Sequence, residues 1–372
     1  GQKPDNWLLG VYRRLAVGYA ADTAVRRQGA SGGVITRALC YLLETGRIDG
    51  AVVVQMGQPR PYQARPVIAT TPEAVRAAAQ SVYMPVPMLT LLDEMAQFNG
   101  RLAFVGLPDQ VAALRLLQQA GHPGAAKVDF VLGPYVGTNL YLGAVANFLQ
   151  AQGGARLDDI AALKFRAGEW PGHLYIRLQD GREFRAEKFY YNYLIPFFVT
   201  RSSLLAVDFT NELTDISVGD AWHPRYEARG EGFSIVVARS EQGEALLAEM
   251  AAAGVVVFEE TSAADALSMH GHMIDFKKRG TFIRLEWRRR LGRAVPAFGY
   301  RPAGIPPGRY LVELVISGLF AICGTRLARQ LVTWVPLGML GPLFDWLRRT
   351  WKNLSKPVKR QGLGHVSFEE TP

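Results

Sequence analysis

Residues 29–46 read GASGGVITRALCYLLETG, and this stretch joins a glycine-rich turn directly to a helical pattern. Apolar residues after the turn recur at the spacing of one helix face. Gly46 is placed to end the helix, since glycine is favoured just past a helix C-terminus. The stretch therefore predicts a helix that begins after Gly33, with its apolar face formed by Val34, Ile35, Ala38, Leu39, Leu42 and Leu43.

The turn at residues 29–33 has the features of an anion-binding loop. A helix start leaves backbone N–H groups without partners and carries the positive end of the helix dipole, and both favour an anion. Glycines remove side chains that would hold a phosphate away from the backbone, and Arg26 and Arg27 add positive charge upstream. Taken alone, however, such a loop is better explained as a flexible connection with Ser31 as an ordinary N-cap.

Strand-like and helical patterns alternate over the first 150 residues, which indicates an α/β domain with a parallel sheet covered on both faces. Ligands of such sheets bind beyond the carboxyl ends of the strands. We therefore expect the loops at 106–109 and 133–137 to lie near one cleft. The predicted strands are 51–55, 102–106 and 128–133, and the predicted helix between the last two is 109–119.

Changes in pattern divide the chain into three predicted parts. Residues 1–152 form the N-terminal domain, 153–298 form an α+β domain, and 299–372 form a helical amphipathic C-terminal tail. Asp180-Gly181 marks a hairpin turn. The elements expected in the second part are strands at 162–166, 174–178, 182–185 and 234–239, a helix at 244–253 and a strand at 255–258.

The predicted tail combines apolar runs with a basic end. Residues 310–323 are almost wholly apolar, and 331–347 are apolar but contain Pro and Gly residues that we expect to break a helix. Both runs are shorter than the roughly 20 residues needed to cross a bilayer. Residues 300–360 therefore fit a segment that docks on a membrane surface or on an integral membrane subunit. A helical hairpin packed on the chain's own core explains the pattern equally well. The helix-breaking residues are Pro336, Gly338, Gly341 and Pro342.

Composition describes a folded protein with a basic surface. The 372 residues include 42 Lys and Arg against 33 Asp and Glu, a formal charge of +9, which favours an anionic partner. The two cysteines, Cys40 and Cys323, lie in apolar patterns and are expected to be small buried residues rather than a disulfide or a metal site. The first five residues lack the apolar region of a signal peptide, so a cytoplasmic location is expected.

Several charged motifs are better explained without a special function. Asp208, Asp215 and Asp220 flank a short strand without His or Cys at ligand spacing, and capping or turn roles for Asp215 and Asp220 are favoured. His270 and His272 lack a third metal ligand. The basic run 277–279, continued by Arg284 and 288–290, predicts a docking face for lipid or an acidic protein. Nucleic-acid binding is not expected, because the run has only Phe276, Phe282 and Trp287 as interleaved aromatic residues and no recognisable module.

In colinear order from about residue 8 to 290, the chain resembles the coenzyme F420 hydrogenase/dehydrogenase beta-subunit family. Such ordered agreement is far more specific than one glycine loop. The matching segments are 27–36 (RQGASGGVIT), 48–52 (IDGAV), 81–83 (SVY), 104–108 (FVGLP), 164–172 (KFRAGEWPG) and 215–220 (DISVGD).

The resemblance implies an FAD site and partner subunits. Members of this family are iron–sulfur flavoproteins that pass electrons between a cluster and a partner. In that setting the turn matches the flavin phosphate loop, and 81–83 matches a second flavin-side segment. Two residues expected to start a helix after Gly137 are further candidate contacts. The implied FAD-binding residues are Gly29, Ala30, Ser31, Gly32, Gly33, Ser81, Tyr83, Thr138 and Asn139.

Departures from the family pattern remove the ligands of an iron–sulfur cluster. Asp109 and Val136 stand where the family usually carries cysteine, and the family's cysteine pair before the Asp-Phe-Thr segment falls in 201–206, where this chain has Arg, Ser, Ser, Leu, Leu and Ala. Thiolates hold such clusters, and valine or serine cannot replace a set of them. We therefore expect FAD but neither an iron–sulfur cluster nor another metal site.

The leading hypothesis is a cluster-free flavoprotein subunit of a redox complex, peripheral on the cytoplasmic side of the membrane. Its chemistry would be hydride transfer at the flavin ring. No catalytic residue is identified, and Lys164 and Arg166 are candidates for a second anionic ligand, although a solvated hairpin face explains them equally well. The alternatives are a cofactor-free structural or assembly subunit and an independent soluble reductase.

Overall fold

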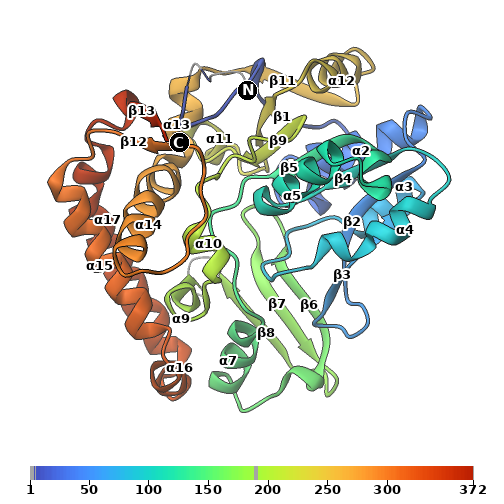
Figure 1. Ribbon diagram of the computed structural model, residues 1–372. Coiled ribbons are helices and arrows are strands. Elements are labelled where there is room, and N and C mark those ends of the chain that lie inside the picture. Colours follow the sequence, from blue (N-terminus) through green and yellow to red (C-terminus); the bar gives the residue numbers. More distant parts are fainter. Residues whose placement is uncertain (1–3, 5, 188–191, 372) are drawn as a thin grey trace.

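A computed structural model describes residues 4, 6–187 and 192–371, and its centre is a sheet of eight strands (Figure 1). The expectation for the first five residues lies outside the described part except at Pro4. Across the sheet the strand order is β11-β1-β10-β9-β5-β4-β2-β3. In chain order these strands are β1 (Arg14–Ala20), β2 (Gly50–Met56), β3 (Ala64–Ala69), β4 (Leu102–Val105), β5 (Val128–Pro134), β9 (Ile216–Asp220), β10 (Ser234–Ala238) and β11 (Val256–Glu260).

The predicted parallel arrangement holds for the centre of the sheet. Strands β2, β4, β5 and β9 run parallel to one another, with Val52 opposite Phe104 and Leu132 opposite Ile216. The outer strands pair antiparallel. The sheet is therefore mixed, and the α/β class is confirmed.

Strands of the large sheet come from both sides of the boundary predicted after residue 152. From the predicted second part, β9, β10 and β11 join the large sheet, and β1 lies between β10 and β11. The remaining strands of that part form a separate antiparallel sheet, in which Asp180-Gly181 makes the predicted turn. These strands are β6 (Ile160–Ala167), β7 (His173–Leu178) and β8 (Glu183–Glu187).

Helices cover both faces of the large sheet, as its apolar strands require. On one face Leu42 and Leu246 contribute to a core with Val53 and Leu132, and on the other Val111 and Leu114 pack with Phe104. Helices of the first face are α2 (Val34–Glu44), α3 (Pro72–Ala77) and α12 (Glu241–Ala252), and those of the second are α4 (Leu92–Gln97), α5 (Pro108–Gln119) and α6 (Pro123–Ala126).

Shorter helices connect the sheets and lead into two longer ones. Helix α13 is followed by a π-helical turn, η4, and then by α14. Their bounds are α1 (Thr23–Gln28), α7 (Gly143–Ala151), α9 (Ile195–Phe198), α10 (Arg201–Leu205), α11 (Pro224–Glu227), α13 (Ala263–Asp275), η4 (Phe276–Gly280) and α14 (Thr281–Arg290); single 3₁₀ turns are η1 (Met88–Leu91), η2 (Leu157–Asp159), η3 (Asn192–Leu194) and η5 (Leu363–His365).

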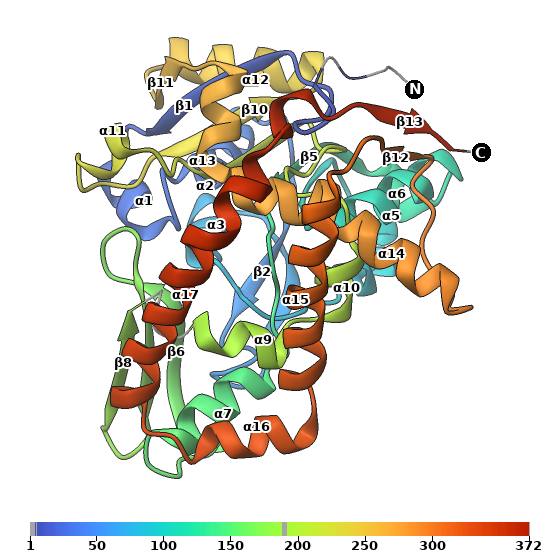
Figure 2. The same ribbon diagram turned by 90° about the vertical axis from the view of Figure 1, so that its left-hand side faces the viewer.

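The tail is helical, as predicted, and lies along one side of the molecule (Figure 2). Figure 2 shows α15 and α17 side by side, with α16 joining their ends. The expected breaks at Gly338, Gly341 and Pro342 are wrong, because α17 runs through all three residues. Pro342 is the sixth residue of the helix and removes one backbone hydrogen bond, but the helix continues past it. The tail elements are β12 (Tyr300–Pro302), α15 (Pro307–Cys323), α16 (Arg326–Thr333), α17 (Leu337–Arg360) and β13 (Phe368–Glu370).

The predicted basic docking patch at 277–279 is wrong. Lys277, Lys278 and Arg279 are each only 1% exposed, because η4 packs against α13, α14 and the tail helix α15. Lys278 pairs with Glu212, and Arg279 pairs with Asp275. Arg284 is buried as well, whereas Arg289 and Arg290 remain exposed. Sequence charge alone does not reveal that the run is buried, or that Glu212 from a distant segment pairs with Lys278.

Candidate functional site: a cleft at the carboxyl ends of the parallel strands

A cleft of about 290 Å³ lies at the carboxyl ends of the parallel strands. Its lining includes Val54 near the end of β2, Val105 at the end of β4 and Gly219 near the end of β9. The loops at 106–109 and 133–137 both contribute residues, so the expectation that they share one cleft is confirmed.

Eight of the nine residues predicted to bind the cofactor line this cleft. The exception is Gly32, which is buried beneath the turn. Its N–H donates to the Ser234 hydroxyl at 2.8 Å, and its carbonyl oxygen accepts from the Ala20 N–H at 2.7 Å. A Cβ at Gly32 would lie 2.5 Å from the Gly18 carbonyl oxygen. The residues that line the cleft are Gly29, Ala30, Ser31, Gly33, Ser81, Tyr83, Thr138 and Asn139.

The start of α2 opens on this cleft without a side-chain cap. Gly33 is the N-cap and has a φ of +73°, which glycine adopts at little cost. Ser31 is not an N-cap, because its hydroxyl shares a 2.7 Å hydrogen bond with the hydroxyl of Ser234. Within the described residues no side chain caps α2. The first-turn residues Val34, Ile35 and Thr36 line the cleft, and N–H groups at this position suit an anionic ligand.

Arg26, one of the two cations upstream of the turn, interacts with groups outside the cleft. Arg26 pairs with Glu231 at 2.7 Å, donates to the Gly232 carbonyl oxygen, and stacks on the Tyr19 ring at 3.8 Å. It is not one of the lining residues, and Arg27 is exposed. The positive potential at the turn therefore comes mainly from the helix start.

A buried ion pair forms part of the cleft wall. The Arg166 guanidinium donates two hydrogen bonds of 3.1 Å to Asp220, and Trp170 Nε1 donates to the same carboxylate at 3.0 Å. Asp220 thus has an ion-pair role rather than the predicted turn or cap role, and its carboxylate matches the charge of Arg166. Lys164 is exposed and does not line the cleft.

The other carboxylates of the sequence cluster have structural roles. Asp215 accepts from the Val131 N–H at 2.8 Å, and Asp208 accepts from the N–H groups of Asn211 and Glu212. His270 lies on α13, and its Nε2 is 2.7 Å from the Asp220 carbonyl oxygen. Among the residues that the structure describes, no group of three or more His, Cys, Asp and Glu could hold a metal ion.

The segment after Gly137 is a loop rather than the predicted helix start. Helix α7 begins at Gly143. The Asn139 N–H instead donates to the Ser203 hydroxyl at 2.8 Å, and Asn139 Oδ1 accepts from the Leu140 N–H. This backbone is fixed by Ser203, which lies on α10.

A buried lysine lies behind the same segment. Lys277 Nζ donates to the Ser203 carbonyl oxygen at 2.6 Å. Burial, and to a lesser extent the Arg284 charge, lower the pKa of Lys277 to about 7, although Asp208 and Asp109 act in the opposite direction.

Sequence reasoning missed several cleft residues. Gln80 has a φ of +96°, a strained conformation for a residue with a side chain, and such strain is concentrated at functional sites. Gln110 joins the 107 and 86 loops, because its amide accepts from the Leu107 N–H and donates to the Val86 carbonyl oxygen. Of these missed residues, Thr36 could have been predicted, because it lies in the first turn of the predicted helix.

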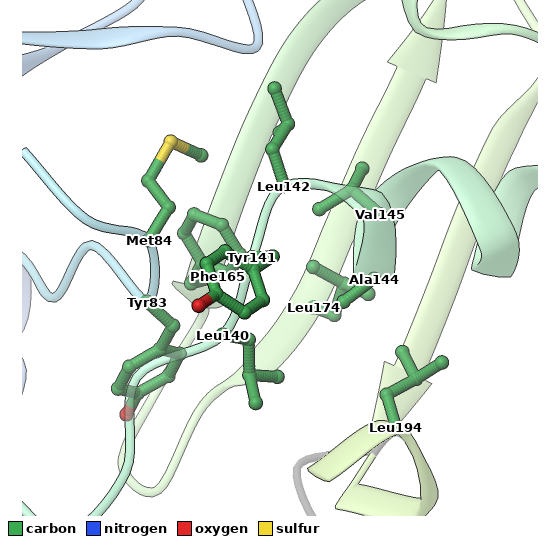
Figure 3. A pocket seen from close by; sticks show the side chains of 10 residues that line it. All are labelled: Tyr83, Met84, Leu140, Tyr141, Leu142, Ala144, Val145, Phe165, Leu174 and Leu194. Atoms are coloured by element: carbon green, nitrogen blue, oxygen red, sulfur yellow. The ribbon is translucent and has the colours of Figure 1, made fainter. Parts of the chain in front are cut away.

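A small apolar chamber of about 20 Å³ adjoins the cleft (Figure 3). Figure 3 shows side chains from the 83–84 loop, the 140–145 segment, β6 and β7 gathered around it. Tyr83 and Met84 line both spaces. The chamber has room for about one water-sized molecule, so the cleft is the space in which a cofactor would fit. The two cysteines lie outside both spaces, and burial raises the pKa of each thiol.

Comparisons with known proteins agree with the resemblance in the sequence. Residues 15–93 match the model for the coenzyme F420 hydrogenase/dehydrogenase beta subunit N-terminus, and residues 99–264 match that for the C-terminus. A coenzyme F420 hydrogenase subunit beta of Methanococcus voltae is 28% identical over 297 residues, 77% of this chain and 99% of that protein. The corresponding subunit of Methanothermobacter thermautotrophicus is 24% identical over 260 residues, 67% of this chain and 84% of that protein.

A solved structure shares the fold. A chain of the F420-reducing NiFe hydrogenase complex from Methanosarcina barkeri superposes with a TM-score of 0.62 at 20% identity. The match covers 79% of this chain and 99% of that one. Residues after 264, which include the whole tail, lie outside both family models.

Proposed function

This chain belongs to the coenzyme F420 hydrogenase/dehydrogenase beta-subunit family, and on that premise we propose that it is a cluster-free flavoprotein subunit of a redox complex. FAD would bind in the cleft at the start of α2. The observation that carries the proposal is the convergence of that uncapped helix start with Ser81, Tyr83, Thr138 and Asn139 on one cleft.

The residues of the cleft fit the two chemical halves of this cofactor. Backbone N–H groups in the first turn of α2 would hold the phosphates, since the helix dipole favours negative charge there. The hydroxyl groups of Ser31, Ser81 and Thr138 supply further neutral donors. Apolar side chains suit a flat ring and exclude water from it, and they include Val53, Val54, Val75, Val82 and Val105.

When bound, FAD supplies hydride chemistry at its ring. The chain's own contribution is binding, orientation and electrostatics. The Arg166–Asp220 pair places a charged but neutralised group in the cleft wall. Because thiolate ligands are missing from the family positions, FAD alone would supply the redox chemistry, and the cleft residues would bind and orient it.

The absorption spectrum of the purified full chain tests this proposal. We expect flavin bands, one FAD per chain after extraction, and neither iron nor acid-labile sulfide. A colourless protein that does not bind added FAD would overturn the proposal and favour the structural-subunit alternative. Iron and sulfide in stoichiometric amounts would overturn its cluster-free part.

A single charge placed in the first turn of α2 tests the site itself. Thr36→Glu introduces a carboxylate that the helix start tolerates well but that repels a phosphate. We expect FAD affinity to fall at least tenfold without a loss of thermal stability. Thr36→Gln is the matched control and should bind FAD almost as the wild type does. Equal affinity in both variants would place the phosphates elsewhere.

A further inference from the structure

Exposed apolar side chains gather on the tail. Most of the large apolar residues that the structure exposes lie between residues 311 and 354, although this region is a small part of the chain. Exposed apolar surface of this extent marks an interaction site. We call these residues the tail face: Leu311, Leu314, Val315, Leu319, Ile322, Leu327, Leu331, Trp334, Met339, Leu343, Trp346, Leu347 and Leu354.

The residues of the tail face follow one stripe along each helix. On α15, Leu311, Val315, Leu319 and Ile322 are spaced three or four residues apart. The same spacing relates Leu327, Leu331 and Trp334 along and just after α16, and relates Met339, Leu343 and Trp346 on α17. Each helix is therefore amphipathic, with one apolar stripe turned away from the body.

The opposite side of α15 is fixed to the body of the protein by buried charges. Arg309 and Glu313 have no exposed surface. Arg309 pairs with Asp275 at 2.9 Å, and Glu313 pairs with both Arg309 and Arg284. Separating α15 from the body would expose or unpair these charges, which is costly.

These anchors favour a tail that lies on a surface over one that crosses a bilayer. Among the described residues, no single helix is long and apolar enough to span a membrane. Helices α15 and α16 are long and apolar enough to span a membrane only when taken together, and the angle between them is 75°. Burial of Arg309 and Glu313 keeps α15 against the sheet domain.

The charge around the tail face is strongly positive. Between residues 314 and 360 the sequence has eight Lys and Arg residues and a single acid, Asp345. Lys352, Lys356 and Arg360 are exposed along the last turns of α17. Trp334 and Trp346 are 78% and 61% exposed, and tryptophan is enriched where apolar and polar membrane layers meet.

We infer that the tail face binds the surface of an anionic lipid bilayer. The apolar stripes would enter the headgroup region, while the basic residues of α16 and α17 contact acidic headgroups. Charge complementarity and exposed tryptophans favour lipid over another protein surface. This inference goes beyond the proposed flavin site and does not depend on it, because the tail face lies outside the cleft and outside both family models.

Sedimentation of the full chain with lipid vesicles tests the inference. We expect binding to vesicles of equal phosphatidylcholine and phosphatidylglycerol, weaker binding at high salt, and little binding to phosphatidylcholine alone. The double variant Trp334→Ser/Trp346→Ser should lose at least tenfold in affinity for the mixed vesicles. The matched control is Leu116→Ser on α5, which removes an equally exposed apolar side chain away from the tail and should bind as the wild type does.

Three results would overturn the inference. The full chain could remain in the supernatant with mixed vesicles, or Leu116→Ser could lose as much affinity as the tryptophan variant. If the wild type self-associates and the tryptophan variant is a monomer, the tail face binds a second copy of the chain instead of lipid. Flavin content and circular dichroism of each variant report on the fold and on the cleft separately, so loss of FAD would not be mistaken for loss of lipid binding.

Discussion

Arg166 and Asp220 form a two-bonded ion pair in the cleft wall, although they are 54 residues apart in the sequence and lie on strands of different sheets. Arg166 is 4% exposed, so removing either charge leaves the other poorly solvated. The pair therefore ties the three-stranded sheet to the carboxyl end of β9.

We predict that Arg166→Met lowers the free energy of unfolding by about 3 kcal/mol, the typical cost of breaking a buried pair. Urea unfolding followed by circular dichroism would measure the loss. The exposed pair Arg182–Asp180 provides the control, and Arg182→Met should change stability by less than about 0.5 kcal/mol. Equal effects in the two variants would contradict a stabilising role for the cleft pair.

Lys277 predicts a specific pH dependence of stability. Burial lowers the folded-state pKa of Lys277 from 10.5 to about 7. Between these values the unfolded chain binds the extra proton, so raising the pH stabilises the folded state through this residue. Relative to Lys277→Met, the wild type should gain about 1 kcal/mol or more between pH 7 and pH 9. Urea unfolding of both proteins at each pH measures this difference, and a constant difference would show that Lys277 does not titrate there.

The buried ion pairs of Glu313 predict that this residue holds the tail against the rest of the protein. Glu313→Gln leaves Arg284 and Arg309 with less negative charge in a fully buried position. We expect a loss of about 3 kcal/mol in stability and faster proteolytic cleavage within the tail than in the sheet domain. Glu369→Gln, which breaks the exposed pair with Arg301, should leave both properties almost unchanged. Unaltered tail proteolysis in Glu313→Gln would contradict the anchoring role.

Gly32 predicts a steric requirement at the turn. Gly32→Ala would place a Cβ 2.5 Å from the Gly18 carbonyl oxygen and 2.9 Å from the Ser234 hydroxyl. We expect the melting temperature to fall by several degrees, equivalent to about 2 kcal/mol. Gly318→Ala on α15 is the control, because nothing lies within 4 Å of its added Cβ, and it should be neutral or slightly stabilising. A neutral Gly32→Ala would show that the turn can move away from β1.

Local patterns predicted the helices and strands well, because each depends on nearby residues. Helix α2, the parallel strands and the turn at Asp180-Gly181 all lie where the sequence placed them. The shared cleft was also predictable, since it follows from strand direction alone. Its occupancy by FAD stays a prediction, as do the domain boundaries and the absence of a cluster.

Pairing between residues far apart in the sequence explains the predictions that the structure contradicts. The residues near Lys278 in the sequence do not predict its pairing with Glu212. Those near Asp220 do not predict its pairing with Arg166. Thr138 and Asn139 are predicted to start a helix, but the Asn139 N–H donates to the Ser203 hydroxyl and the segment is a loop. Each of these contacts joins residues more than 50 positions apart, beyond what periodicity can report.

The hydrogen bond between the Ser31 and Ser234 hydroxyls has a consequence for biosynthesis. The glycine turn is synthesised some 200 residues before its partner strand β10. Strand β1 likewise pairs on its two edges with β10 and β11, which are both synthesised later. The end of the cleft at the glycine turn is therefore complete only after β10 and β11 have been synthesised and paired with β1.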